Sequence, residues 1–390
     1  MQVSARLSGT GAEPMPMPLQ TVRRQLDYTA AQVIDLLTRR AAALNLPIAT
    51  QTSLKTKLSR WENGKEQPSA VYRRLFREIY GRTNAELGFP EEPDEHPETA
   101  ELRSRLALAR TVDRQTVDLF RQQIDHARHV DRRFGGVTLL DQLRSQIDQV
   151  HGLLSYGTGG HRSALAGALT EASTLAGWQA LDRAAPGQAW THYERAKAAA
   201  REAGSPALLA HATAEQAFVL LDLDETEAAV EQLAHARTLA EHTASPLLRA
   251  WLAAAHGEAL AAAGHGDDAR RAFDMADALL PANPVDPELP FVFLGGSHLD
   301  RWRGHALTRL GAPEAIDQLT DALARLPAAF VRARSGLLVD LAYAYATAGD
   351  REAALTHTRH ARRLAAQIKS DRHQHQLSRL VLPGGGSTTA

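Results

Sequence analysis

Residues 187–196 read GQAWTHYERA, and four later segments repeat this pattern of a turn followed by a helix. They are TEAAVEQLAHA (226–236), DDARRAFDMA (267–276), APEAIDQLTDA (312–322) and DREAALTHTRHA (350–361). Each segment contains two alanines seven residues apart, and the first alanines of successive segments lie 40, 40, 46 and 39 residues apart. A repeat of this length predicts stacked helix pairs, because one pair cannot bury its apolar face alone.

A small residue precedes each segment at a nearly constant distance, where two helices must touch. Alanine is abundant and aromatic residues make up only 5% of the chain, which favours packed helices over sheets. We therefore expect an all-α fold with an α-solenoid over residues 161–382. An irregular alanine-rich bundle is the alternative. The small residues are Gly177, Ala217, Gly257, Gly304 and Ala342.

The five segments resemble tetratricopeptide repeats, including the turn at Gly349–Ala354. The resemblance covers about residues 160–368, and it implies helix pairs that line a concave, ligand-binding groove. The period exceeds the roughly 34 residues of this family, which predicts extended helices or loops. The longest step contains a proline-rich excursion, PANPVDPELP, at residues 281–290.

The N-terminal part of the chain is basic. Residues 19–82 carry twelve basic and five acidic residues, whereas the whole chain has a net charge of −1. A basic head on an acidic body is typical of a protein that binds a polyanion, and a solvated charged surface is the alternative. Cap and breaker residues predict four short helices: Leu19–Leu26, one from the capping box Thr29–Gln32, Ser53–Trp61, and one from Pro68-Ser69 to Gly81.

The string LSRWENGKEQPS (58–69) resembles the end of the recognition helix of bacterial helix-turn-helix repressors of the xenobiotic-response-element type. One departure is that Thr29 to Trp61 spans over a dozen residues more than the compact pattern, with the insertion around residues 39–50. A major groove admits one helix, whose polar and basic side chains reach base edges and phosphates. The predicted DNA-binding residues are Arg23, Arg24, Thr52, Ser53, Lys55, Thr56, Lys57, Ser59, Arg60 and Lys65.

The whole arrangement is similar to the peptide-sensing, quorum-sensing regulators of the Rap/Rgg/PlcR class and to large actinobacterial families, from which the string DRRFGG (131–136) is also familiar. The resemblance implies that a peptide or small-molecule ligand in the groove changes the geometry of a homodimer. This change in turn alters the affinity of the dimer for a double-stranded DNA operator. The repeat register carries ligand contacts onto Trp178, Asp182, His211, Phe218, Trp251, Glu258, His298, Arg301, His305 and Tyr343. The rival interpretation is an interaction scaffold that sequesters another regulator without binding DNA.

The expected domains are a disordered lead-in (1–18), a helix-turn-helix head (19–89), a linker (90–98), connecting helices (99–160, with one continuous helix from Thr99 to about Arg132), the repeats (161–382) and a flexible tail (383–390). The chain has no cysteine, which excludes disulfides and thiolate metal sites. It has no run of about 18 apolar residues, so we expect a cytoplasmic protein without a membrane span. The paired histidines are interpreted as surface residues, and no catalytic string occurs. We therefore expect no metal, no cofactor and no enzymatic activity.

Overall fold

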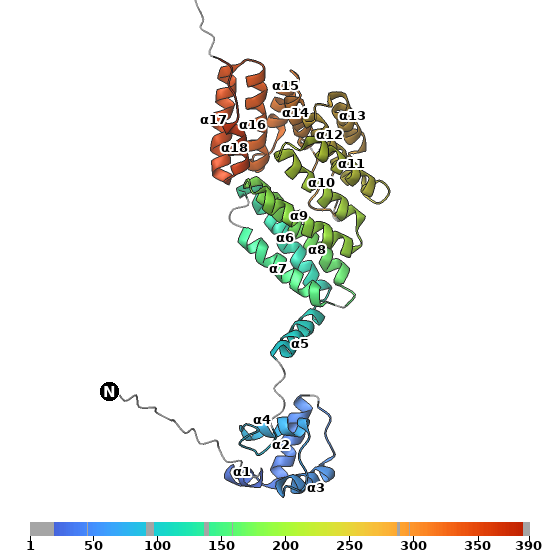
Figure 1. Ribbon diagram of the computed structural model, residues 1–390, viewed down its shortest axis with the longest axis vertical. Helices are drawn as coiled ribbons and strands as arrows, with labels where there is room; N and C mark the ends of the chain where they lie inside the picture. The colour runs from blue at the N-terminus through green and yellow to red at the C-terminus, as the bar shows by residue number, and fades with distance from the viewer. Residues whose placement is uncertain are drawn as a thin grey trace, which may run out of the picture. The chain divides into compact units, whose positions relative to one another are not determined.

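The computed structural model describes residues 19–44, 46–90, 97–135, 140–157, 159–286, 289–295 and 297–384. These residues form helices and irregular segments, with no strand among them, and the chain divides into two compact units, 1–102 and 103–390 (Figure 1). The predicted lead-in, residues 91–96 of the predicted linker and residues 385–390 of the tail lie outside the described residues. Within these described ranges, no helix is long and apolar enough to cross a bilayer.

The first unit packs four helices around one apolar core. The predicted capping box is present, since the Thr29 side chain accepts the Gln32 backbone N–H and the Gln32 side chain accepts that of Thr29. Gly64 and Gly81 adopt left-handed conformations, with φ of 68° and 60°, as helix-ending glycines do. The helices are α1 (Leu19–Gln25), α2 (Ala30–Ala43), α3 (Gln51–Glu62) and α4 (Ala70–Tyr80).

The connection between α2 and α3 is a packed segment and not a tight turn. It runs from the end of α2 at Ala43 to the start of α3 at Gln51, whereas a helix-turn-helix motif joins its helices with three or four residues. Leu46 and Ile48 pack against the core of the head. The Ala49 backbone N–H donates a hydrogen bond of 2.8 Å to the Tyr72 hydroxyl. The insertion noted in the sequence is therefore part of the folded head.

In the second unit, helices within residues 114–156 precede the helix pairs, and the helix at residues 97–110 spans the boundary at residue 102. The prediction of one continuous helix from Thr99 to about Arg132 is wrong, because the Asp113 side chain accepts the Thr116 backbone N–H and begins a new helix there. The remaining helices are α5 (Pro97–Arg110), α6 (Arg114–Phe134), α7 (Leu140–Tyr156), α8 (Arg162–Asp182), α9 (Pro186–Ala203), α10 (Pro206–Asp222), α11 (Thr226–Ala240), α12 (Pro246–Ala262), α13 (Gly266–Leu279), α14 (His298–Arg309), α15 (Ala315–Arg325), α16 (Val331–Thr347), α17 (Arg351–Ile368) and α18 (Asp371–Ser378).

Small residues allow the two helices of each repeat to approach closely. A Cβ added at Gly177 would lie 2.7 Å from the Tyr193 ring, and one at Gly257 would lie 2.8 Å from the Phe273 ring. At Gly304 a Cβ would lie 2.6 Å from the Leu319 side chain. The two alanines seven residues apart are buried in each of the five predicted segments. The prediction of five helix pairs in register is thus confirmed for α8/α9, α10/α11, α12/α13, α14/α15 and α16/α17.

The end of the repeat array packs back against its beginning. Helices α16 and α17 contact α6, and α18 contacts α8 (Figure 1). At the end of α6, Gly135 has a φ of 80°, and a Cβ there would collide with the Ile368 carbonyl oxygen at the end of α17. On α18, Arg372 donates hydrogen bonds to both carboxylate oxygens of Asp222 at the end of α10. The helices of this unit therefore enclose an interior.

Replacing Gly257 by Ala tests the close packing of α12 on α13. The added methyl group has no room beside Phe273, so we expect the free energy of unfolding to fall by about 1–3 kcal/mol. The control is Gly152→Ala in α7, where a Cβ meets nothing within 4 Å. That variant should gain about 0.5–1 kcal/mol, because alanine is the better helix residue. Urea unfolding followed by circular dichroism measures both, and equal stability of the two variants would refute the packing.

Candidate functional site

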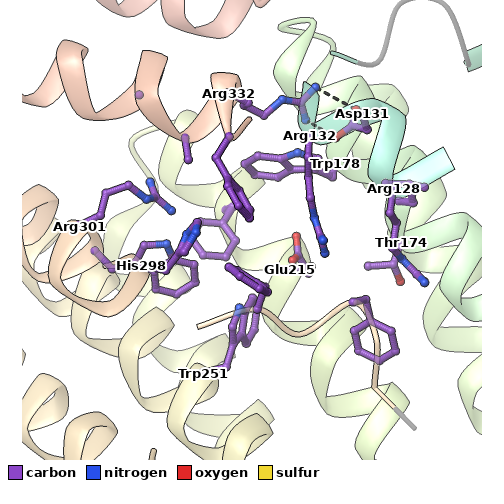
Figure 2. A pocket seen from close by; sticks show the side chains of 18 of the residues that line it. Arg128, Asp131, Arg132, Thr174, Trp178, Glu215, Trp251, His298, Arg301 and Arg332 are labelled. Carbon is purple, nitrogen blue, oxygen red and sulfur yellow. Dashed lines mark hydrogen bonds and ion pairs between the residues drawn. The ribbon is translucent and has the colours of Figure 1, made fainter. Parts of the chain in front are cut away.

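A cavity of about 290 Å³ lies inside the second unit (Figure 2). Its walls come from α6, α8, α10, α12, α14, α16 and α18, together with the segment that joins α13 to α14. This volume is at the lower end of the roughly 300–1,000 Å³ that small-molecule sites occupy. We take this cavity as the candidate ligand site because side chains of seven helices converge on it.

The repeat register correctly selects side chains that face this interior. Among the ten residues expected from the sequence, eight line the cavity, and they come from the first helices of four successive repeats. Figure 2 shows Trp178, Trp251, His298 and Arg301 arranged around it. The eight residues are Trp178, His211, Phe218, Trp251, Glu258, His298, Arg301 and His305.

The two other expected residues lie elsewhere. Asp182 is buried, accepts a hydrogen bond of 2.7 Å from the Ser370 hydroxyl and pairs with Arg332 at 3.2 Å. Asp182 therefore holds the last repeat in place. Helix α18, which follows the repeats, covers the position on the groove that the repeat register predicted for this side chain. Tyr343 lines a second cavity, of about 810 Å³, and donates its hydroxyl to the Gln376 carbonyl oxygen at 2.6 Å.

Sequence reasoning missed the residues that reach the cavity from outside the repeat register. Arg128, Asp131 and Arg132 come from α6, and Phe291 and Phe293 come from the segment after the proline-rich excursion. Further missed residues come from α16 and α18, which reach the interior because the array closes on itself. The string DRRFGG, which resembles a string in actinobacterial regulators, contains Asp131 and Arg132. It was the feature of the sequence that pointed to these two residues. The missed residues on the last helices are Arg332, Asp340, Arg372 and His373.

Two of the arginines in the wall are neutralised by buried carboxylates. Arg128 donates to Glu171 at 2.8 Å, and both side chains are buried. Arg332 pairs with Asp131 at 2.8 Å, as Figure 2 shows. Burial raises the pKa of Asp131, and Arg332 opposes this shift. A buried charge requires such a partner, so these pairs serve to hold the wall together.

Two other arginines, Arg132 and Arg301, point into the cavity from α6 and α14 (Figure 2). In the described ranges neither guanidinium makes an ion pair or a hydrogen bond to the protein, and the Nε atom of Arg301 is buried without a partner. Burial lowers the pKa of both groups. Arg132 lies over the Phe293 ring, with its Cζ atom 5.3 Å from the ring centroid. These two cations are available to an anion.

A charged histidine lies at the floor of the cavity. The His305 Nδ1 atom is 2.6 Å from Asp340, and its Nε2 atom is 3.3 Å from Glu258. Burial lowers the pKa of His305, but the two carboxylates outweigh burial and raise it to about 9. Burial raises the pKa of Glu258, but His305 outweighs it and lowers the pKa to about 2. His305 is therefore an imidazolium at neutral pH, already matched by its own acids.

Aromatic rings form much of the rest of the wall, together with Glu215 and aliphatic or small polar side chains. The Trp251 ring lies 5.5 Å from that of Trp302 and 4.9 Å from that of His211, centroid to centroid. Phe293 stacks on Phe330 at 5.3 Å. Burial and the neighbouring Arg128 lower the pKa of His211 to about 3, so that its ring is uncharged at neutral pH. The wall thus offers flat apolar surfaces beside two cations.

The expected DNA-binding residues lie in the other unit, mostly on one face of α3. Leu54, Leu58 and Trp61 bury the opposite face of this helix. Lys57 is half-buried, and both Lys57 and Arg60 lie near Glu66, at 3.7 and 3.5 Å. The exposed residues of the expected set are Arg24, Thr52, Ser53, Lys55, Thr56, Ser59, Arg60 and Lys65.

Arg23 has a different place from the one expected. Its guanidinium donates to both Glu62 carboxylate oxygens, at 2.6 and 3.0 Å, and to the Tyr28 carbonyl oxygen at 3.0 Å. Its hydrogen bond and ion pair with Glu62 raise the pKa of Arg23, despite burial. Arg23 therefore braces α1 against α3, and we remove it from the expected phosphate contacts.

No protein-family model matches this sequence, and no curated protein matches it. Two crystal structures from Podosopora anserina, described as kinesin light chain nearly identical TPR-like repeats, are similar to it. The first, a Q17M variant, has 18% identity and a TM-score of 0.35, covering 54% of this chain and 99% of its own. The second has 18% identity and a TM-score of 0.34, covering 57% and 100%. The repeat architecture described here rests on the packing of the five helix pairs.

Replacing His305 by Gln tests the charged floor of the cavity. A folded-state pKa of about 9 lies above the ordinary 6.5, so protonated His305 stabilises the fold below pH 6.5 and loses this effect as pH rises through 9. Between pH 7.5 and 9 the wild-type protein should lose about 1–2 kcal/mol of stability that His305→Gln does not lose. Urea unfolding at several pH values measures this. The exposed His375 gives a control, since His375→Gln should keep the wild-type slope; a wild-type slope in His305→Gln would contradict the assignment.

Proposed function

We propose that this chain is a cytoplasmic, sequence-specific DNA-binding transcriptional regulator, and that its helical-repeat unit senses a ligand, either a peptide or a small molecule. The observation that carries the proposal is the two-sided character of α3. Its apolar face is fixed in the core of the head, and its other face exposes Lys55, Thr56, Ser59 and Arg60. An exposed helix with hydroxyl and cationic side chains suits a major groove.

The exposed side chains divide into two roles. Lys55, Thr56 and Arg60 lie along the middle and end of α3, where they can reach base edges. Arg24 and Lys65 lie outside α3 and are exposed, so they suit phosphate contacts on either side. One such head reads only a few base pairs, and useful specificity calls for two heads on a two-fold site. We therefore propose a homodimer on double-stranded DNA.

The cavity gives the regulator its input. A ligand can change DNA affinity only if it binds two arrangements of the protein with different affinity. The cavity wall joins α6, which precedes the repeats, to α16 and α18, which end them. A ligand that bridges these helices favours the closed arrangement over any opened one. We propose that the ligand acts through this change between a closed and an opened arrangement of α6, α16 and α18.

A second candidate function is supported by two features of the head. The α2–α3 connection is longer than the turn of a helix-turn-helix motif, and Glu66 lies within 4 Å of both Lys57 and Arg60. Both features suit a head that binds another protein. The chain would then be a scaffold that sequesters a regulator without binding DNA. DNA titration separates the two functions.

The variant Lys55→Ala/Lys57→Ala/Arg60→Ala tests α3 as the reading helix. Fluorescence anisotropy with DNA from the promoter of the chain's own gene, at two salt concentrations, measures affinity. We expect the wild type to bind specifically with a steep salt dependence, and the variant to lose at least 100-fold in affinity with its helicity and melting intact.

The matched control is Arg39→Ala/Arg74→Ala/Arg82→Ala. This variant also removes three positive charges, but from parts of the head other than α3. Its affinity should fall much less than that of the α3 variant. Specific binding retained by the folded α3 variant would exclude α3 as the reader. A wild-type chain that shows no specific DNA binding would favour the scaffold.

A further inference from the structure

We propose that the cavity takes a compact aromatic carboxylate, with its carboxylate in the part of the cavity that Arg132 and Arg301 enter and its ring against the aromatic wall. This inference rests on the proposed role of the cavity as the sensor site and names the chemistry of its ligand. Arg132 comes from α6 and Arg301 from α14, and both point into the cavity (Figure 2). The two arginines therefore come from a helix before the repeats and from one inside them.

The charges of the wall select an anion. Arg128 and Arg332 are matched by Glu171 and Asp131 within the wall. Arg372 is matched by Asp222, and His305 by Asp340 and Glu258. In the part of the chain that the structure describes, Arg132 and Arg301 are the two cations of the wall without a carboxylate within 4 Å, although Asp340 and Glu258 act on Arg301 from farther away and Glu215 is a further buried acid of the wall.

An uncompensated cation in a buried site carries a large desolvation cost, which a bound carboxylate offsets. The geometry of a guanidinium also suits a carboxylate, because its N–H donors match the two oxygens. The Nε atom of Arg301 and the Nε2 atom of His298 are both buried without a hydrogen-bond partner. These two nitrogen atoms add hydrogen-bonding capacity to the part of the wall beside Arg301.

The apolar part of the wall selects a ring. Trp251 and Trp302 meet edge to face, and Phe293 stacks on Phe330 beside His298. Arg132 already lies over the Phe293 ring, so a bound ring there would share an aromatic and cationic environment. With a cavity of about 290 Å³, the site suits a single-ring or indole-sized molecule better than an extended peptide.

Isothermal titration calorimetry on the full chain tests the proposal with four probes: 3-phenylpropionate, indole-3-acetate and the primary amide of each. The amides keep the ring and remove the charge. We expect each carboxylate to bind at least tenfold more tightly than its amide. In Arg301→Gln and in Arg132→Gln this preference should fall below threefold, with melting unchanged or raised because an unpaired buried charge is removed.

Two further variants make the result specific. Arg301→Lys keeps a cation and should retain part of the preference. Arg303→Gln is the matched control on the same helix, since Arg303 pairs with Asp274 and does not line the cavity. It should bind all four probes as the wild type does.

Equal affinity for acids and amides would overturn the proposal, as would an undiminished preference in Arg301→Gln or no binding by either carboxylate. The DNA titration above is independent of these measurements. A chain that prefers carboxylates but does not bind DNA would retain this inference and refute the proposed regulator. A chain that binds DNA but lacks the carboxylate preference would refute this inference and retain the proposed regulator.

Discussion

The guanidinium of Arg332 is buried between the carboxylates of Asp131, at 2.8 Å, and Asp182, at 3.2 Å. These contacts join α16, near the end of the chain, to α6 and α8, which come much earlier in the sequence. Removing one partner of a buried ion pair costs about 3–5 kcal/mol, because the charge that remains has no water to solvate it. The last repeat is thus held against the first helices of the unit. Without this closure the repeats would form an open groove, and the cavity would lose the walls that α6, α16 and α18 provide.

The repeats could be predicted because the packing within each pair depends on local pattern. Gly177, Gly257 and Gly304 leave room for the ring or side chain of the partner helix, and that requirement is visible as a spacing in the sequence. The same register selected the inward faces of α8, α10, α12 and α14. The assignment of Asp182 to the groove failed because register describes an open solenoid. It contains no information about α18, which returns and covers that position.

Arg128, Arg132 and Arg332 could not be predicted by any repeat rule. They reach the cavity through contacts between segments that are up to 201 residues apart, such as the bond from Arg332 to Asp131. The unpaired state of Arg132 and Arg301 depends on where every nearby carboxylate lies, which is a property of the folded chain. The string at residues 131–136 marked the place in the sequence, but its role follows only from the closure.

In the head, the helices could be predicted from cap and breaker residues, because these residues determine helix ends within one turn of the chain. The role of Arg23 required the tertiary contact with Glu62, and the packed α2–α3 connection required the contact of Ala49 with Tyr72. Because Arg23 pairs with Glu62, it leaves the set of cations expected to contact DNA, in which Arg24, Lys55, Arg60 and Lys65 remain exposed. The head thus offers a helix with an exposed polar face, and the repeat unit offers a cavity with two cations that have no carboxylate within 4 Å.

The central claim is that the closure of the last repeat onto the first helices builds the cavity. Hydrogen–deuterium exchange of Arg332→Met, compared with the wild type, tests it most directly. The account predicts faster exchange at the end of α6, in α16 and in α18, with the pairs α10/α11 and α12/α13 unchanged. Unchanged exchange throughout, or an increase spread evenly over all the repeats, would contradict the claim.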